Sequence, residues 1–254
     1  MVGRLFLGAL AASLGIAIFV FTPFLQRAIL SGLEVRRITA AEIAVAAEQA
    51  AAVGDETRVL FIGNSFTFGH DVPSRVAALA AADGRTIEVL MLAQGGARLA
   101  DTLALNGMRA VLTGDGWAAI VLQDHSTAAL DPAWAADSMA AITYAARLAG
   151  TTPVILVTPW ARQEGHALYA TPIRTGVPQP ANPAAMTRAA EAHFAAAAAA
   201  FPAVRVAPVA AAWDEAIAAG ANLHGPDRYH AAGDGAALAA EVIWETLEPL
   251  LPRD

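Results

Sequence analysis

Residues 59–70 read VLFIGNSFTFGH, an apolar run that stops abruptly at Gly-Asn-Ser. The first four are apolar and two of them are β-branched, which predicts a strand buried on both faces. Gly63 and Asn64 then supply the backbone freedom for a sharp turn. Ser65 is left at the carboxyl end of the strand, where open α/β sheets bind their ligands, so its hydroxyl is a candidate nucleophile. The alternative from this stretch alone is that Ser65 only caps the next helix.

Further apolar runs follow and alternate with Ala-rich segments of helical spacing. The predicted strands are residues 87–92, 118–122, 153–157 and 204–208, and the predicted helices are residues 76–82, 99–112, 134–148, 183–200, 209–219 and 235–247. This alternation is typical of the α/β class, with a five-stranded parallel sheet covered by helices on both faces. The long stretch 160–182, rich in Gly and Pro, follows the end of a strand, and we expect it to form a wall of the substrate site.

The amino-terminal segment differs from the rest of the chain. Residues 5–25 form an uncharged apolar run of 21 residues, long enough to cross about 30 Å of hydrocarbon and longer than the core of a secretory signal. We predict a transmembrane helix within an anchor over residues 1–27, with a cleaved signal segment as the alternative. A spacer, helical over residues 38–53, is expected over 28–56, and the catalytic domain over 57–254.

Composition excludes several functions. The net charge is −7, from 16 basic and 23 acidic residues without a basic block, which argues against nucleic acid as a partner. Every basic residue is Arg, so a Schiff-base lysine and the lysine of a phosphate-binding loop are both absent. The chain has no Cys, which removes disulfides, thiolate catalysis and Cys-based zinc sites.

Other predicted strands also end in polar or small residues. Residues 94–98 read QGGAR, where accessible backbone N–H groups follow a strand, and residues 122–126 read LQDHS. Residues 225–230 read GPDRYH and precede the last helix. An Asp three residues before a His can orient the imidazole through Nδ1–H and leave Nε2 free to take a proton from a serine. This spacing is weak evidence alone, but its position just before the closing helix makes it more informative.

These motifs resemble the four sequence blocks of the SGNH (GDSL-like) hydrolase family. The blocks correspond, in the right order, to residues 63–65 (GNS), residues 95–96 (GG), residues 121–124 (VLQD) and residues 227–230 (DRYH). They span residue 57 to about residue 250. Asn64 stands where the family name has Asp, and Gln123 stands where the third block usually has Asn.

The resemblance implies a flavodoxin-like three-layer α/β/α fold and esterase-type acyl transfer without a metal or organic cofactor. Ser65 would be the nucleophile, His230 the general base and Asp227 the residue that orients it. The implied oxyanion donors are the N–H of Ser65, the N–H of Gly95 or Gly96, and the side-chain amide of Gln123.

Other polar and aromatic residues are candidates for the substrate site. We expect Asn64, Asp124, His125 and Trp160 to bind substrate, and Trp160, Arg162, His166 and Tyr169 to form a sugar- or acyl-binding rim. Asp124 and His125 are alternatively expected to hydrogen-bond the loops that hold Ser65. A metal site built from His70-Asp71 and Asp124-His125 is disfavoured, because adjacent residues on a strand point to opposite faces. His224 competes with His230 as the base, but no Asp precedes it by three residues.

We therefore predict a membrane-anchored serine esterase for small acyl or acetyl esters, carbohydrate esters included, with its catalytic domain outside the cytoplasm (periplasmic). Cleavage of the anchor would make it a secreted protein. An O-acyltransferase acting on a polysaccharide is one alternative, and an anchored ligand-binding domain without catalysis is another. A domain that only binds ligands has no need for a complete Ser, His and Asp set.

Overall fold

The computed structural model describes residues 36–52 and 54–252. Five parallel strands form one sheet, β1 (Arg58–Gly63), β2 (Glu88–Ala93), β3 (Ala119–Gln123), β4 (Val154–Val157) and β5 (Val204–Ala207), in the order β2-β1-β3-β4-β5. The predicted five-stranded parallel sheet is confirmed, and its strand order is the flavodoxin-like one. The predicted transmembrane helix over residues 5–25 lies outside the described residues. Within residues 36–52 and 54–252, no helix is both long and apolar enough to cross a membrane.

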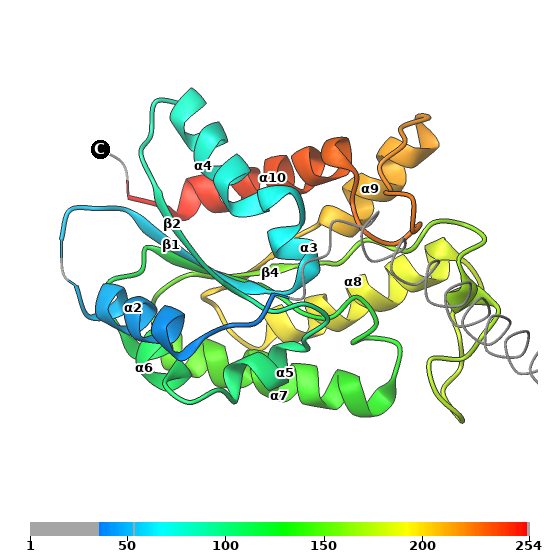
Figure 1. Cartoon of the computed structure of the whole chain (residues 1–254), viewed down its shortest axis with the longest axis horizontal. Helices are drawn as coiled ribbons and strands as arrows, with labels where there is room; N and C mark the ends of the chain where they lie inside the picture. Colours follow the sequence, from blue (N-terminus) through cyan, green and yellow to red (C-terminus); the bar gives the residue numbers. More distant parts are fainter. Residues whose placement is uncertain (1–35, 53, 253–254) are drawn as a thin grey trace, which may run out of the picture. The chain divides into compact units, whose positions relative to one another are not determined.

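Helices cover both faces of the sheet (Figure 1). One face carries α2 (Ala40–Ala51), α5 (Leu99–Leu103), α6 (Met108–Thr113), α7 (Pro132–Ala149) and α8 (Pro183–Ala199). The other carries α4 (Val72–Ala82), α9 (Val209–Ala218) and α10 (Gly233–Leu247). Short helical turns lie at α3 (Ser65–Phe68), Gly69–Asp71, Ala167–Tyr169 and Glu248–Leu250. The chain thus has the three layers expected from its alternating pattern.

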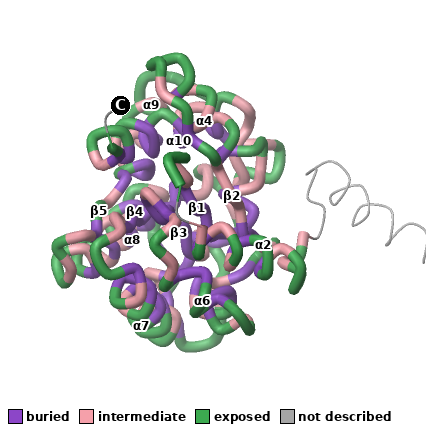
Figure 2. The backbone as a smooth tube through the Cα atoms, turned by 90° about the vertical axis from the view of Figure 1, so that its left-hand side faces the viewer, coloured by how far each residue is buried: buried purple, intermediate pink, exposed green. Residues whose placement is uncertain are grey.

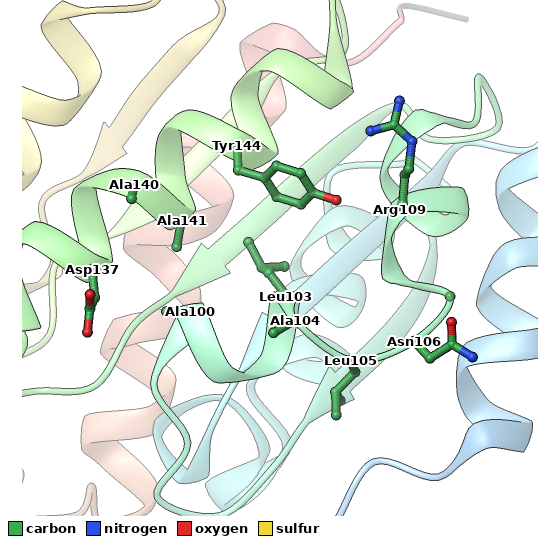
Figure 3. A pocket seen from close by; sticks show the side chains of 11 residues that line it. Ala100, Leu103, Ala104, Leu105, Asn106, Arg109, Asp137, Ala140, Ala141 and Tyr144 are labelled. Atoms are coloured by element: carbon green, nitrogen blue, oxygen red, sulfur yellow. The ribbon is translucent and has the colours of Figure 1, made fainter.

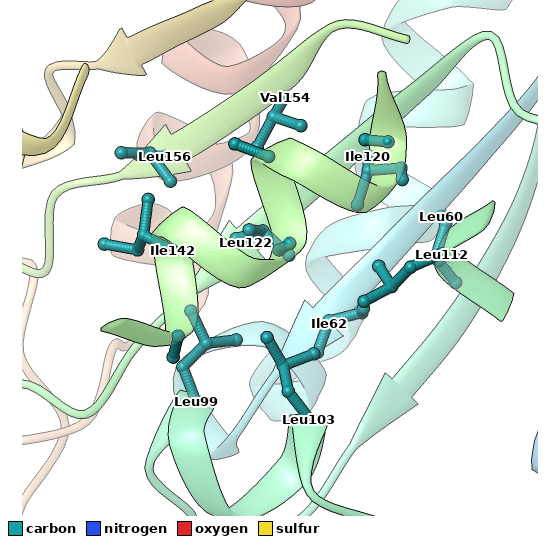
Figure 4. Close-up of a cluster of buried hydrophobic side chains, with 14 of the residues drawn as sticks. Leu60, Ile62, Leu99, Leu103, Leu112, Ile120, Leu122, Ile142, Val154 and Leu156 are labelled. Atoms are coloured by element: carbon teal, nitrogen blue, oxygen red, sulfur yellow. The ribbon is translucent and has the colours of Figure 1, made fainter. Parts of the chain in front are cut away.

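Two apolar cores fill the space between the layers, and the alternation of side chains along each strand separates them. Leu60 and Ile62 of β1 point into the core beneath α5 and α7, which Figure 4 shows with Leu122 of β3. Val59 and Phe61 point into the opposite core beneath α4 and α10. Figure 2 shows buried residues along the sheet strands and exposed residues on the outer sides of the helices. Strands buried on both faces read as continuous apolar runs, which is why the sequence predicts them well.

The predicted helix over residues 99–112 is two helices in the structure. Helix α5 ends at Leu103, and α6 starts at Met108 after Gly107, whose φ of +94° is one that residues with a Cβ rarely adopt. Pattern alone missed this break because the apolar spacing continues through the turn. Helix α4 also starts earlier than predicted, at Val72, where Asp71 caps it and Pro73 occupies its first turn.

Helix α2 falls in the segment predicted to be a spacer. It starts with a capping box in which Thr39 and Glu42 satisfy each other's backbone N–H groups. Its apolar residues Ile43, Ala46 and Ala50 are buried in the same core as β1 and β3. The helix is therefore part of the packed domain, and residues just before it reach the carboxyl end of the sheet.

Candidate active site

Ser65 lies two residues after the end of β1 and is the first residue of α3. Asn64 caps this helix: its Oδ1 accepts the N–H of Phe66 at 3.1 Å, and its Nδ2 donates to the Ala97 carbonyl at 3.0 Å. The capping role belongs to Asn64, so the Ser65 hydroxyl is available for another partner. With only 2% of its surface exposed, Asn64 shapes the turn, and the expectation that it contacts substrate is corrected.

The structure brings Ser65, His230 and Asp227 together from opposite ends of the domain. The distance from His230 Nε2 to Ser65 Oγ is 2.9 Å, and that from His230 Nδ1 to Asp227 Oδ2 is 2.6 Å. Asp227 Oδ1 also accepts the backbone N–H groups of Tyr229 and His230 at 3.0 and 2.9 Å. This carboxylate therefore fixes both the imidazole and the turn that carries it.

Two opposing effects act on the pKa of Asp227. Partial burial raises it, because a charged carboxylate loses hydration. The hydrogen bonds from the His230 side chain and from two backbone N–H groups lower it by more, so the pKa lies below its usual value. Asp227 is therefore ionised at neutral pH, and its charge can stabilise an imidazolium on His230.

The predicted oxyanion donors differ in whether their N–H groups are already hydrogen-bonded. The backbone N–H groups of Ser65 and Gly96 donate to no other group of residues 36–52 and 54–252, and Gly96 has a φ of +66° in the turn after β2. The N–H of Gly95 donates to the Arg36 carbonyl at 2.9 Å. Ser65 and Gly96 are thus the available backbone donors, and Arg36, just before α2, occupies that of Gly95.

The side chain of Gln123 turns back toward β1. Its Oε1 accepts the Asn64 N–H at 3.1 Å and the Thr67 hydroxyl at 3.0 Å, and its Nε2 donates to the Asp124 carbonyl. A Cβ on Gly63 would lie 2.9 Å from this Oε1, so Gly63 leaves room for the amide. In this structure the Gln123 amide therefore holds the turn that carries Ser65, and its Nε2 is already hydrogen-bonded to a backbone carbonyl.

Asp124 and His125 act mainly on neighbouring loops. Asp124 is 1% exposed, and its Oδ1 accepts the N–H groups of Leu99 and His125 at 2.7 and 2.6 Å. It joins the start of α5 to the turn after β3, whereas the alternative prediction named the loops that hold Ser65, and at 1% exposure it offers a substrate almost no surface. His125 is half-buried and its Nδ1 lies 2.8 Å from the Thr127 hydroxyl. Burial first, and then the positive charge of Arg162, lower the pKa of His125.

Trp160 lies beneath the site and does not line it. It is 1% exposed and stacks between Phe66 and Trp213, with ring centroids 4.0 and 4.4 Å apart and planes within 6°. Its Nε1 donates to the Tyr229 carbonyl at 3.1 Å. The prediction that Trp160 binds substrate is corrected, because a fully stacked ring has no free face. It supports the segment that carries His230.

Sequence reasoning missed the remaining members of this aromatic column. Phe66 follows Ser65, Tyr229 precedes His230, and their rings are 5.1 Å apart. The Tyr229 ring is 4.1 Å from that of His230. The aromatic residues next to Ser65 and next to His230 were the available signal. It did not show that Trp213, far along the chain, would complete the column.

His224 is kept away from the triad contacts by its own packing. Its Nε2 is bonded to the Ala161 carbonyl at 2.9 Å, and its ring meets Trp213 edge-on. Burial lowers its pKa, so the neutral form is favoured. In the described ranges, no group of three or more His, Asp or Glu side chains is arranged to hold a metal ion.

Two hollows lie on the surface besides the triad. One of about 530 Å³ runs between α5, α6 and α7, lined by Leu103, Arg109 and Tyr144 among others (Figure 3). Another of about 560 Å³ lies between α9 and the stretch 160–182, lined in part by Trp213 and His224. Neither is lined by a triad residue, so size alone would not locate the candidate active site.

The comparisons with known proteins agree with the geometry. No family model and no curated protein matches the chain. Among solved structures, a candidate SGNH hydrolase from Slackia heliotrinireducens is 29% identical, with a TM-score of 0.61 over 76% of this chain and 99% of that one. A DUF4886 family protein from Bacteroides uniformis is 19% identical, with a TM-score of 0.62 over 79% of this chain and 87% of that one. A lipase/acylhydrolase from Enterococcus faecalis is 18% identical, with a TM-score of 0.56 over 78% of this chain and 98% of that one.

The fold is therefore that of the SGNH hydrolases, and the resemblance indicated by the four sequence blocks is confirmed. At the level of the class, the 29%-identical structure supports a hydrolase of the SGNH type.

Proposed function

We propose that this protein is a serine esterase that cleaves small acyl or acetyl esters, carbohydrate esters included, through an acyl-enzyme on Ser65. The observation that carries the proposal is the continuous chain of hydrogen bonds from Ser65 through His230 to Asp227. Its members come from the turn after the first strand and from the segment before the last helix. Neither fold stability nor ligand binding alone requires this order of groups.

The mechanism follows from the charges and the geometry. His230 Nε2 takes the Ser65 proton while Oγ attacks the ester carbonyl, and ionised Asp227 stabilises the resulting imidazolium. The tetrahedral oxyanion accepts hydrogen bonds from the N–H groups of Ser65 and Gly96. His230 then protonates the leaving alcohol. Water, activated by the same imidazole, releases the acid and restores Ser65.

The test is release of 4-nitrophenol from acetate, butyrate and longer esters by the full-length protein in detergent. Ser65→Ala and His230→Ala should each lower kcat by about 10⁴-fold or more. Ser74→Ala is the matched control, because Ser74 is exposed on α4 and its hydroxyl takes no part in the proposed mechanism. Equal activity of the parent and the two triad variants would refute the esterase proposal.

The same assay separates hydrolysis from acyl transfer. If the acyl-enzyme is resolved by an alcohol, added sugar should raise the rate of 4-nitrophenol release and yield acylated sugar in place of free acid. If water is the acceptor, the product stays free acid at every sugar concentration. A protein that binds an ester and never releases 4-nitrophenol would be a ligand-binding domain.

We also propose that residues 5–25 anchor the enzyme in the membrane with its active site on the extracytoplasmic side. The support is the uncharged run of 21 residues alone. Fractionation of cells expressing the full chain and a chain without residues 1–27 would test it. Retention of the shortened chain in the membrane fraction would contradict this proposal.

A further inference from the structure

Arg162 places a positive charge beside the triad. It follows β4 by five residues, and its guanidinium carbon lies 4.2 Å from the centre of the Tyr229 ring. That ring in turn is 4.1 Å from the imidazole of His230. The guanidinium is therefore one aromatic ring away from the proposed general base.

The guanidinium of Arg162 has few partners of its own. Within residues 36–52 and 54–252 no carboxylate lies within 4.0 Å of it, although the residue is half-buried. Its Nε is buried without a hydrogen-bond partner. Its Nη1 lies 3.5 Å from His166 Nε2. A desolvated cation in this state is costly unless an anion or an aromatic face compensates it.

The groups around Arg162 show where its charge acts. Burial lowers its pKa, while Tyr229, Tyr169 and Asp227 raise it; a guanidinium remains protonated in any case. Its charge lowers the pKa of His125, beyond the end of β3, and contributes to the lowered pKa of His166, on the stretch 160–182. Arg162 therefore acts on both the β3 side of the site and the loop side.

We propose that Arg162 is the recognition residue for an anionic group of the substrate, so that the preferred ester carries a carboxylate or a phosphate near the scissile bond. The planar guanidinium suits the paired oxygens of either anion, and a bound anion would compensate the charge of this half-buried group. This inference rests on the proposed esterase function and gives its substrate class. The alternative is that Arg162 only holds Tyr229 in place.

The experiment compares mono-4-nitrophenyl glutarate, which is anionic, with neutral 4-nitrophenyl butyrate at low salt. The parent should favour the anionic ester in kcat/KM by about tenfold or more, the usual size of a charge-assisted hydrogen bond. Arg162→Gln should lower this ratio by a similar factor, mainly through KM of the anionic ester, and Arg162→Lys should lie between. If Arg162 has a purely structural role, Arg162→Gln would lower kcat/KM equally for both esters and leave their ratio unchanged. That result would overturn the proposal.

Arg147→Gln is the matched control, because it removes the same charge from the exposed last turn of α7, and its ratio should equal that of the parent. Competition by glutarate and by inorganic phosphate distinguishes the two anion classes. The anion that inhibits the parent more strongly than Arg162→Gln identifies the class. Equal inhibition of both proteins by both anions would contradict an anion site at Arg162.

A binding measurement separates this inference from the proposed function. Full-length Ser65→Ala, which cannot form an acyl-enzyme, is titrated calorimetrically with monomethyl glutarate and with dimethyl glutarate. The anionic monoester should bind about tenfold more tightly, and Arg162→Gln added to Ser65→Ala should abolish the difference. If no ester is cleaved by the parent, the esterase proposal fails and this titration alone decides the anion site. Equal affinity for the two compounds would overturn it.

Discussion

The two sides of the candidate active site are held by different forces. On the nucleophile side, Asn64, Gln123 and Asp124 are all at most 4% exposed and bond the turns after β1, β2 and β3 to one another. On the base side, the segment carrying Asp227 and His230 is largely exposed and rests on stacked aromatic rings. Directional hydrogen bonds at the edge of the sheet thus hold the nucleophile side in place. Ring packing and the carboxylate of Asp227 hold the base side.

The nucleophile side is therefore expected to be rigid and the base side to be adjustable. Buried hydrogen bonds leave Ser65 little freedom, because breaking one of them would leave a buried polar atom without a partner. Aromatic stacking tolerates small displacements, and the loop over residues 160–182 joins the base side. Substitutions on the base side are therefore expected to change the substrate preference. Substitutions on either side are not expected to change the type of reaction.

The largest expected effect is on the base side. Asp227→Asn keeps an oxygen that can accept the N–H groups of Tyr229 and His230, so the turn should persist. The amide nitrogen would then face His230 Nδ1 and favour the wrong tautomer, lowering kcat by about 10³- to 10⁴-fold. Ester turnover together with circular dichroism checks this. A fully active Asp227→Asn would show that Asp227 only shapes the turn.

Truncating the centre of the aromatic column should destabilise the protein most. Trp160→Ala removes two stacked contacts and the bond to the Tyr229 carbonyl, and is expected to cost about 3–5 kcal/mol of unfolding free energy. Denaturant unfolding measures it. Trp134→Ala, at a half-buried tryptophan on α7, is the control and should cost less. The reverse order would mean that the column does not support the base side.

Gln123→Ala tests the nucleophile side. Removing the amide leaves the Asn64 N–H and the Thr67 hydroxyl without their acceptor, so stability should fall by about 1–3 kcal/mol and kcat should fall with it. Gln179→Ala, at an exposed glutamine, should change neither. A loss of kcat with stability unchanged would instead assign Gln123 the oxyanion role expected from the sequence.

The smallest expected effect concerns the loop of the base side. Arg174 pairs with the fully buried Asp131, whose Oδ1 caps α7. This pairing first, aided by the helix N–H groups and opposed by burial, lowers the pKa of Asp131. A lowered pKa in the folded state adds stability above the unfolded pKa of about 4, and the gain is lost as pH falls through the folded pKa.

Arg174→Gln should therefore be less stable than the parent at pH 7, and the gap should close as the pH falls below about 4. Thermal unfolding from pH 3 to pH 8 measures the gap. Arg188→Gln, at an exposed position on α8, is the control for loss of one charge. A gap that does not vary with pH would show that Arg174 acts through packing and not through its charge on Asp131.

The fold class, the strand positions and the three residues of the proposed triad could be predicted from the sequence. Apolar runs buried on both faces, such as β1, are local signals that need no knowledge of neighbours, and the four ordered blocks located Ser65, Asp227 and His230. The periodicity also found α7 and α10 within a few residues. It did not find the break at Gly107, because a positive φ leaves no mark on hydrophobic spacing.

The roles of the other polar and aromatic residues depend on contacts that form only in the folded chain. Asn64, Asp124 and Trp160 looked like binding residues in the sequence, and folding buried each of them as a support. Gln123 turned toward β1 because Gly63 left space for its amide, which depends on two strands lying side by side. Burial and the choice of partners depend on residues distant in the chain. The sequence therefore could not show that the half-buried guanidinium of Arg162 lies beside Tyr229 with no carboxylate near it.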